Sequence, residues 1–94
     1  MISYNFKNKT VVITGGAKGI GLETALQFAK SGANVSILSK TFYEELDSKF
    51  KSYENKIKFY KVDVTNSKSL KKSVKEIINK SGSIDILVNN ASIA

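Results

Sequence analysis

The sequence predicts an α/β protein with a doubly wound parallel sheet, in which strands and helices alternate as βαβαβαβ. Three observations carry this prediction: four short apolar segments have the length and composition of strands, the segments between them carry apolar residues at helical spacing, and a glycine-rich turn joins the first strand to the first helix. Strands that alternate with helices favour right-handed crossovers, so we expect a parallel sheet with the strand order 3-2-1-4.

The first half of the chain supplies two strands and two helices. The first strand is expected at residues 10–13, and the first helix covers 19–31, where Gly32 provides a C-terminal stop. Residues 34–38 are short, β-branched and apolar, which indicates a buried strand. Apolar residues recur at helical intervals over 42–54 and predict an amphipathic helix. Its acidic residues lie along an outward face and do not converge on one point, so we predict no metal site.

The second half repeats the pattern. A third strand is expected over 57–64, and a third helix begins near Asn66 and Ser67 and ends at Ser81 and Gly82. Residues 84–88 form the expected fourth strand, which runs into two asparagines. This order places the turn after the first strand at the topological switch point of the sheet, where ligands bind in such folds.

The turn after the first strand has the sequence Thr-Gly-Gly-Ala-Lys-Gly-Ile-Gly over residues 14–21. Gly15 allows a tight turn, while Gly19 and Gly21 remove side chains where a ligand and the strand must come close. The backbone amides then lie at the positive N-terminus of a helix, which is a site for a phosphate. The alternative is a glycine-rich turn that closes a strand-helix unit and binds nothing. The contacts predicted in this run are Gly15, Lys18, Gly19, Ile20 and Gly21.

The composition excludes several kinds of chemistry. The chain has 94 residues and contains neither cysteine nor histidine. It therefore has no disulfide, no thiol nucleophile and no thiolate metal site, and it lacks the commonest general base and metal ligand. No segment has the apolar core of a signal peptide or the length needed to span a bilayer, so we expect a cytoplasmic protein without a membrane partner.

The net charge of +7 raises the alternative of a nucleic-acid binder. All 15 basic residues are lysines, however, and Lys71 and Lys72 form the only adjacent pair. Without arginine there is no planar fork for bidentate contacts to bases or phosphates. A solvated lysine-rich surface explains the charge better, and no nucleic-acid partner is predicted.

The glycine spacing resembles the Thr-Gly-x-x-x-Gly-x-Gly signature of the short-chain dehydrogenase/reductase family, whose fold is Rossmann-like. Asp63 and Val64 resemble the family's Asp-Val pair, which implies contacts to the adenine of a dinucleotide. The run Asn-Asn-Ala at 89–91 resembles the family's Asn-Asn-Ala-Gly and implies ribose contacts at Asn90 and Ala91. Ser92 stands where the family usually has glycine. Asp63 has a local alternative, which is to cap the loop before the third helix.

The end of the second strand bears on the choice of dinucleotide. No carboxylate lies over residues 33–41 to bind the ribose 2′-hydroxyl of NAD, and Lys40 stands there beside Ser39. Lys18 in the glycine turn adds a second cation. In the family that the chain resembles, a basic residue at either place goes with NADP, so we predict NADP, with Ser39 and Lys40 on its 2′-phosphate. The alternative is that both lysines are ordinary exposed residues.

The resemblance implies reversible hydride transfer between NADP(H) and a carbonyl or alcohol substrate. Family members use a serine and a Tyr-x-x-x-Lys pair for proton transfer, and none of the four tyrosines here is followed by lysine at that spacing. We therefore predict no catalytic residue, and expect 1–94 to be the N-terminal part of a longer single-domain reductase that forms a homo-oligomer. The alternative is a non-catalytic, truncated or split NADP-binding module.

Overall fold

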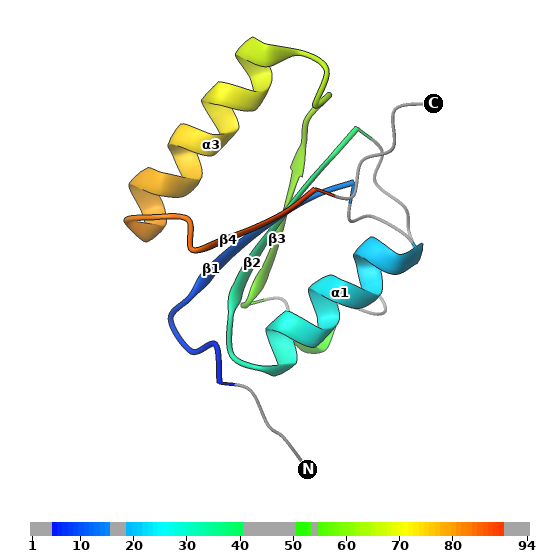
Figure 1. The fold of residues 1–94 in the computed structure, drawn as a ribbon, viewed down its shortest axis with the longest axis vertical. Coiled ribbons are helices and arrows are strands. Elements are labelled where there is room, and N and C mark those ends of the chain that lie inside the picture. Colours follow the sequence, from blue (N-terminus) through cyan, green and yellow to red (C-terminus); the bar gives the residue numbers. More distant parts are fainter. Residues whose placement is uncertain (1–4, 16–18, 41–50, 54, 90–94) are drawn as a thin grey trace.

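The computed structural model describes residues 5–15, 19–40, 51–53 and 55–89 of the chain (Figure 1). The elements, in chain order, are β1 (Thr10–Thr14), α1 (Gly19–Lys30), β2 (Asn34–Ser39), the 3-10 turn η1 (Lys51–Tyr53), β3 (Ile57–Lys61), α3 (Ser67–Ser81) and β4 (Ile86–Asn89). In the described residues an α-helix follows β1 and another follows β3, as the sequence predicts.

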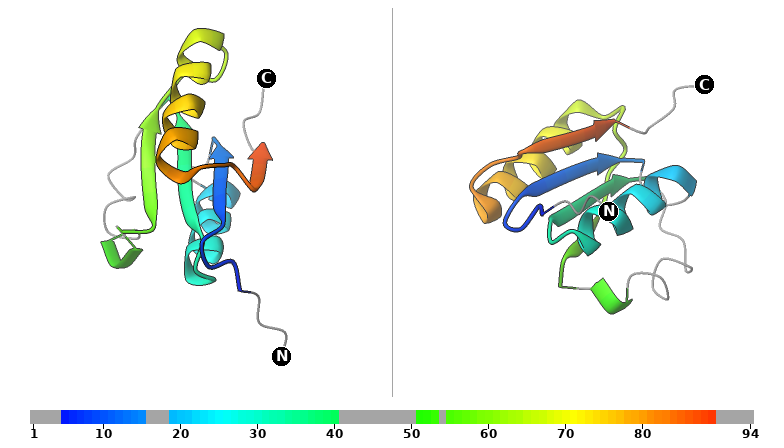
Figure 2. Two further views of the ribbon diagram at one scale, coloured as in Figure 1. Left: turned by 90° about the vertical axis from the view of Figure 1, so that its left-hand side faces the viewer. Right: turned by 60° about the horizontal axis from the view of Figure 1, so that its bottom comes forward.

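The four strands form one parallel sheet in the order β3-β2-β1-β4, which confirms the predicted order 3-2-1-4. Figure 2 shows all four strand arrows pointing to the same end of the sheet. The register is continuous: Val11 pairs with Val35 of β2 and with Ile86 of β4, and Val35 pairs with Ile57 of β3. The strand ends that follow these pairs therefore share one edge, which we call the carboxyl edge.

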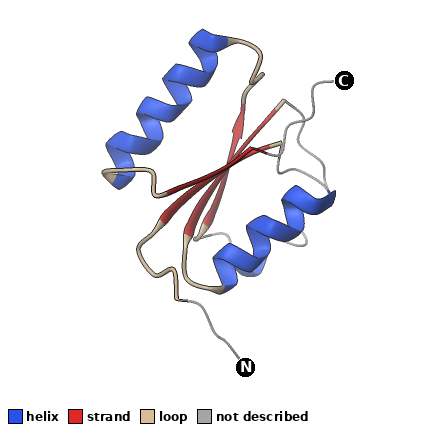
Figure 3. Cartoon of the chain, viewed as in Figure 1, coloured by secondary structure: helices blue, strands red, loops and turns tan. Residues whose placement is uncertain are grey.

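The two described α-helices lie on opposite faces of the sheet, α1 on one side and α3 on the other (Figure 3). Because successive strand residues point to opposite faces, each helix covers alternate residues of the strands. The larger core lies on the α1 face and the smaller core on the α3 face. The α1 core contains Val11, Ile13, Ala25, Ala29, Ala33, Val35, Ile37 and Ile57, and the α3 core contains Val12, Leu38, Val62 and Ile77.

Local hydrogen bonds and glycine conformations set the helix limits. Asn66 caps α3 by accepting a hydrogen bond from the amide of Ser69 at 3.2 Å, and the amide of Gly82 closes the other end on the carbonyl of Ile78 at 2.7 Å. Gly32 follows α1 at a φ of 97°, where other residues are strained. The predicted ends of both helices are thereby confirmed to within one residue.

Two strand limits differ from the prediction by more than one residue, and an aspartate lies near each of them. β3 ends at Lys61 and not at residue 64. The carboxylate of Asp63 accepts two hydrogen bonds from Thr65, and in the turn that they form the chain leaves the sheet. β4 begins at Ile86 and not at residue 84. Asp85 precedes it and exchanges two hydrogen bonds with Thr10, one through its carboxylate at 2.8 Å and one through its amide at 2.9 Å.

The predicted helix over 42–54 lies mostly outside the described residues. Within that range the structure describes only 51–53, which form η1.

Candidate functional site

The carboxyl edge brings together predicted site residues from three strands. Gly15 follows β1, Ser39 ends β2, and Asp63 lies two residues beyond β3. Two backbone hydrogen bonds tie these ends to one another: the amide of Gly15 donates to the carbonyl of Leu38 at 2.8 Å, and the amide of Val62 donates to the carbonyl of Ser39 at 2.9 Å. Residues that are distant in sequence thus form one continuous edge.

The glycine turn has the conformation that its sequence predicts at its first position. Gly15 has a φ of 71°, in the left-handed region that side chains disfavour. α1 begins four residues later at Gly19, so the positive end of the helix dipole lies at the carboxyl edge, and Gly21 in its first turn is buried. Lys18 lies outside the described residues, and Ile20 is described through its backbone alone.

Thr14 and Asn89 join the central strand to its neighbour at this edge. The hydroxyl of Thr14 donates to Oδ1 of Asn89 at 2.9 Å, across 75 positions of sequence. The bond fixes the last residue of β1 just before the glycine turn. Asn90 and Ala91, the predicted ribose contacts, lie outside the described residues.

Asp63 is held by a residue that the sequence analysis did not select. Its Oδ1 accepts hydrogen bonds from the hydroxyl of Thr65 at 2.6 Å and from the amide of Thr65 at 3.0 Å. The bond from the hydroxyl lowers the pKa of Asp63 most, and the bond from the amide adds to this effect. The charge of Lys40 lowers that pKa further. A threonine two residues after an aspartate is the signal for such a turn.

Lys40 is exposed at the end of β2, and its charge acts on the Asp63 carboxylate beyond β3. The edge therefore presents a cation and an anion side by side on neighbouring strands. The cation can bind a phosphate, and the anion can accept a hydrogen bond from a donor group of a ligand.

Val64 faces a separate, apolar hollow on the α3 side of the same edge. Its volume is about 450 Å³, and it is lined by Val12, Thr14, Leu38, Val64, Thr65, Leu70, Val74, Leu87 and Asn89. Leu87 of β4 is 65% exposed there.

The described part of the chain holds no helix long and apolar enough to cross a membrane. It also holds no group of three or more carboxylates that could bind a metal ion.

Comparison with known proteins points to one family. The family described as short chain dehydrogenase matches residues 9–94. Among curated proteins, the chain is 42% identical over 90 residues to the 3-oxoacyl-(acyl-carrier-protein) reductase FabG of Thermotoga maritima, and this match covers 93% of the chain and 36% of the reductase. The chain thus spans little more than a third of the length of the curated relatives it matches.

Solved structures agree. ElxO, solved with NADP bound, is 44% identical with a TM-score of 0.82, and the match covers 92% of this chain and 36% of ElxO. A structure from Haemophilus influenza that holds NAD is 28% identical with a TM-score of 0.82, and that match covers 96% of this chain and 33% of the other. Similar proteins therefore bind either dinucleotide.

Proposed function

This chain belongs to the short-chain dehydrogenase family, and from that premise we propose that it is the NADP(H)-binding part of an oxidoreductase. The observation that carries the proposal is the left-handed Gly15 between β1 and the N-terminus of α1. Backbone amides at such a turn suit the diphosphate of a dinucleotide, since no side chain at Gly15 blocks the approach. In the proposed complex, Lys18, Gly19, Ile20 and Gly21 complete this contact.

The end of β2 supports NADP over NAD. The described residues 33–40 contain no carboxylate that could accept the ribose 2′-hydroxyl, and Lys40 lies there with its charge exposed. Lys40 lies at the carboxyl edge, where we place the 2′-phosphate between Lys40 and Ser39. Because the ammonium is a point charge without the planar fork of arginine, we expect a moderate preference.

The remaining contacts of the proposal concern the adenine and a ribose of the dinucleotide. We assign the adenine to Asp63 and Val64, at the end of β3. Asp63 is negatively charged at neutral pH, so its carboxylate can accept a hydrogen bond from an amino group, and the contacts with Thr65 and the charge of Lys40 lower its pKa further. Asn90 and Ala91 remain the proposed ribose contacts.

For the whole protein we propose reversible hydride transfer between NADP(H) and a carbonyl or alcohol. The bound dinucleotide supplies the hydride, and this chain's residues bind and orient it. The serine and the Tyr-x-x-x-Lys pair would come from outside these 94 residues. The second candidate is a module that binds NADP and turns nothing over. An assay of the product of the complete reading frame separates the two, because only the reductase oxidises NADPH when a carbonyl substrate is present.

The proposal also includes a cytoplasmic homo-oligomer. β4 pairs only with β1 in the described sheet, and an open strand edge with an exposed Leu87 favours association. Sedimentation of the protein across a concentration series tests this part.

A titration of NADPH and NADH into the chain at one salt concentration tests the choice of cofactor. We expect NADPH to bind more tightly than NADH. Lys40→Glu should weaken the affinity for NADPH by about tenfold or more, because a charge-assisted bond is lost, and should change the affinity for NADH little. Lys72→Glu on the exposed surface of α3 makes the same change in net charge and is the control. Equal affinities, or an NADH preference unchanged by Lys40→Glu, would overturn the assignment of NADP.

A further inference from the structure

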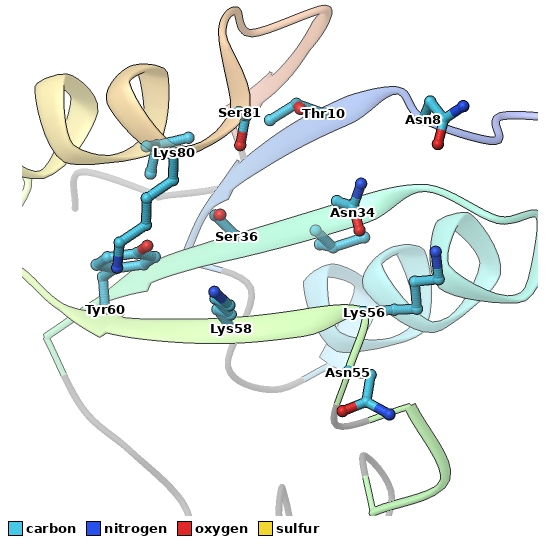
Figure 4. A pocket seen from close by; sticks show the side chains of 12 residues that line it. Asn8, Thr10, Asn34, Ser36, Asn55, Lys56, Lys58, Tyr60, Lys80 and Ser81 are labelled. Atoms are coloured by element: carbon cyan, nitrogen blue, oxygen red, sulfur yellow. The ribbon is translucent and has the colours of Figure 1, made fainter.

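A second hollow lies at the opposite end of the sheet, where the strands begin. Figure 4 shows it on the α3 side, over the first residues of β1, β2 and β3 and beside the last turn of α3. Its volume is about 390 Å³, within the range of small-molecule sites. Because Thr10 and Gly15 lie at opposite ends of β1, the hollow is roughly 16 Å from the glycine turn at about 3.3 Å per strand residue.

The floor of this hollow is polar where a covered sheet face is normally apolar. Thr10 and Ser36 point to the α3 face at the start of their strands, and they are only 3% and 8% exposed. Ser36 pairs with Lys58 of β3, and Leu38, two residues further along β2, pairs with Tyr60. The same face thus changes from hydroxyl and ammonium groups to the apolar α3 core along each strand.

Three lysines line the hollow and no carboxylate does, among the described residues. Lys56 directly precedes β3, Lys58 is its second residue, and Lys80 lies in the last turn of α3. In Figure 4, Lys80 reaches down to the ring of Tyr60, and Lys58 lies beside Ser36.

Two carboxylates contact lining residues, and both have partners. Glu76 pairs with Lys80 at 3.1 Å, and Asp85 accepts the amide of Thr10. The hydrogen bond that Lys80 donates to Glu76 raises the pKa of Lys80, and Tyr60 beside it raises that pKa further. The three lysines outnumber these two carboxylates, so the hollow keeps a positive charge.

We propose that this hollow binds the phosphoryl group of a small phosphorylated ligand. Lys58 and Lys80 supply the opposing charge, and the hydroxyls of Ser36 and Tyr60 supply neutral hydrogen-bond donors. A phosphate dianion matches this set, because lysine binds phosphate as a point charge and hydroxyls fill the remaining acceptor positions. When the ligand binds, the ammonium of Lys80 leaves the exposed carboxylate of Glu76 and contacts the phosphate instead. The site is separate from the carboxyl edge, so the ligand and the dinucleotide bind together.

Inorganic phosphate is the probe, titrated into the isotope-labelled 94-residue chain at constant ionic strength with NADPH present. We expect saturable amide shifts at Thr10, Ser36 and Lys58 in the NMR spectrum. Lys58→Gln should weaken phosphate binding by about tenfold, since it removes one charge-assisted bond. Lys30→Gln on the exposed surface of α1 removes the same charge on the other face and should leave the affinity unchanged.

Because Lys58 is exposed, its variant should fold as the natural chain does, which far-UV circular dichroism checks. Non-saturating shifts, or equal weakening by the two variants, would show only general attraction to a basic protein and would overturn the proposal. Displacement of phosphate from Thr10, Ser36 and Lys58 by NADPH would also overturn it, since the two sites would then not be separate.

Discussion

Replacing Gly15 by alanine should weaken cofactor binding and destabilise the fold, and the two effects can be separated. Gly15 has a φ of 71°. A side chain in that left-handed region costs roughly 1–2 kcal/mol. In a domain of this size each 1 kcal/mol shifts the Tm by about 4–8 °C, so Gly15→Ala should lower the Tm by about 4–16 °C.

Gly82→Ala is the matched control for this strain. Gly82 has a φ of 88°, and a Cβ built on it meets nothing within 4 Å, so the variant carries the backbone strain alone. It should lower the Tm by a similar amount and leave the affinity for NADPH unchanged. Gly15→Ala should in addition weaken NADPH by about ten- to a hundredfold, the equivalent of one charge-assisted hydrogen bond from the turn.

Thermal unfolding by circular dichroism and NADPH titration by fluorescence give the two readouts on the same samples, below the Tm of each variant. If both variants lose stability and both keep the natural affinity, the glycine turn does not bind the diphosphate. The proposal of an oxidoreductase, which rests on Gly15, would then be refuted, whereas the fold assignment would not be affected.

Three further predictions concern the edges of the sheet. Thr65→Val should raise the pKa of Asp63 toward its ordinary value of 3.8, which NMR of the carboxylate carbon measures. Because the pKa of Asp63 is depressed in the folded state, the stability that it contributes is present above pH 3.8 and is lost as the pH falls through the folded pKa. Thr14→Val should lower the free energy of unfolding by about 1 kcal/mol in urea, and a double-mutant cycle with Asn89→Ala should recover a coupling, unless the bond between them is absent in solution. Leu87→Gln should change the free energy of unfolding by less than about 0.5 kcal/mol, because Leu87 is 65% exposed, yet it should weaken any self-association seen by sedimentation.

The sequence was sufficient to predict the strand order, which follows from right-handed crossovers between alternating strands and helices. It was also sufficient to predict the limits of α1 and α3, because these depend on local signals. Helical spacing ends at Gly32 and Gly82 in the sequence, and both glycines have a positive φ in the structure. The end of β3 and the start of β4 depend on contacts of aspartate side chains, which the pattern of apolar residues does not predict. Asp85 sets the start of β4 through Thr10, which is 75 positions away, and no local rule could have predicted that contact.

The candidate site divides in the same way. Gly15 was predicted because its conformation follows from the glycine spacing itself. The interaction between Lys40 and Asp63 was not predicted, since it depends on β2 and β3 ending side by side at the carboxyl edge. Lys18, Asn90 and Ala91 lie outside the described residues, and their contacts stay predictions.

The two hollows have a common origin in how α3 covers its face of the sheet. In the described structure α1 has three buried apolar side chains, Leu22, Ala25 and Ala29, whereas α3 has one, Ile77. A helix that buries so little leaves both ends of the sheet face open, the polar beginning of the strands and their apolar carboxyl end. The residues along the strands then decide what each opening can hold, and lysines and hydroxyls at one end with Leu87 at the other suit different ligands. The position of α3 thus accounts for both the proposed anion site and the apolar hollow with its exposed Leu87.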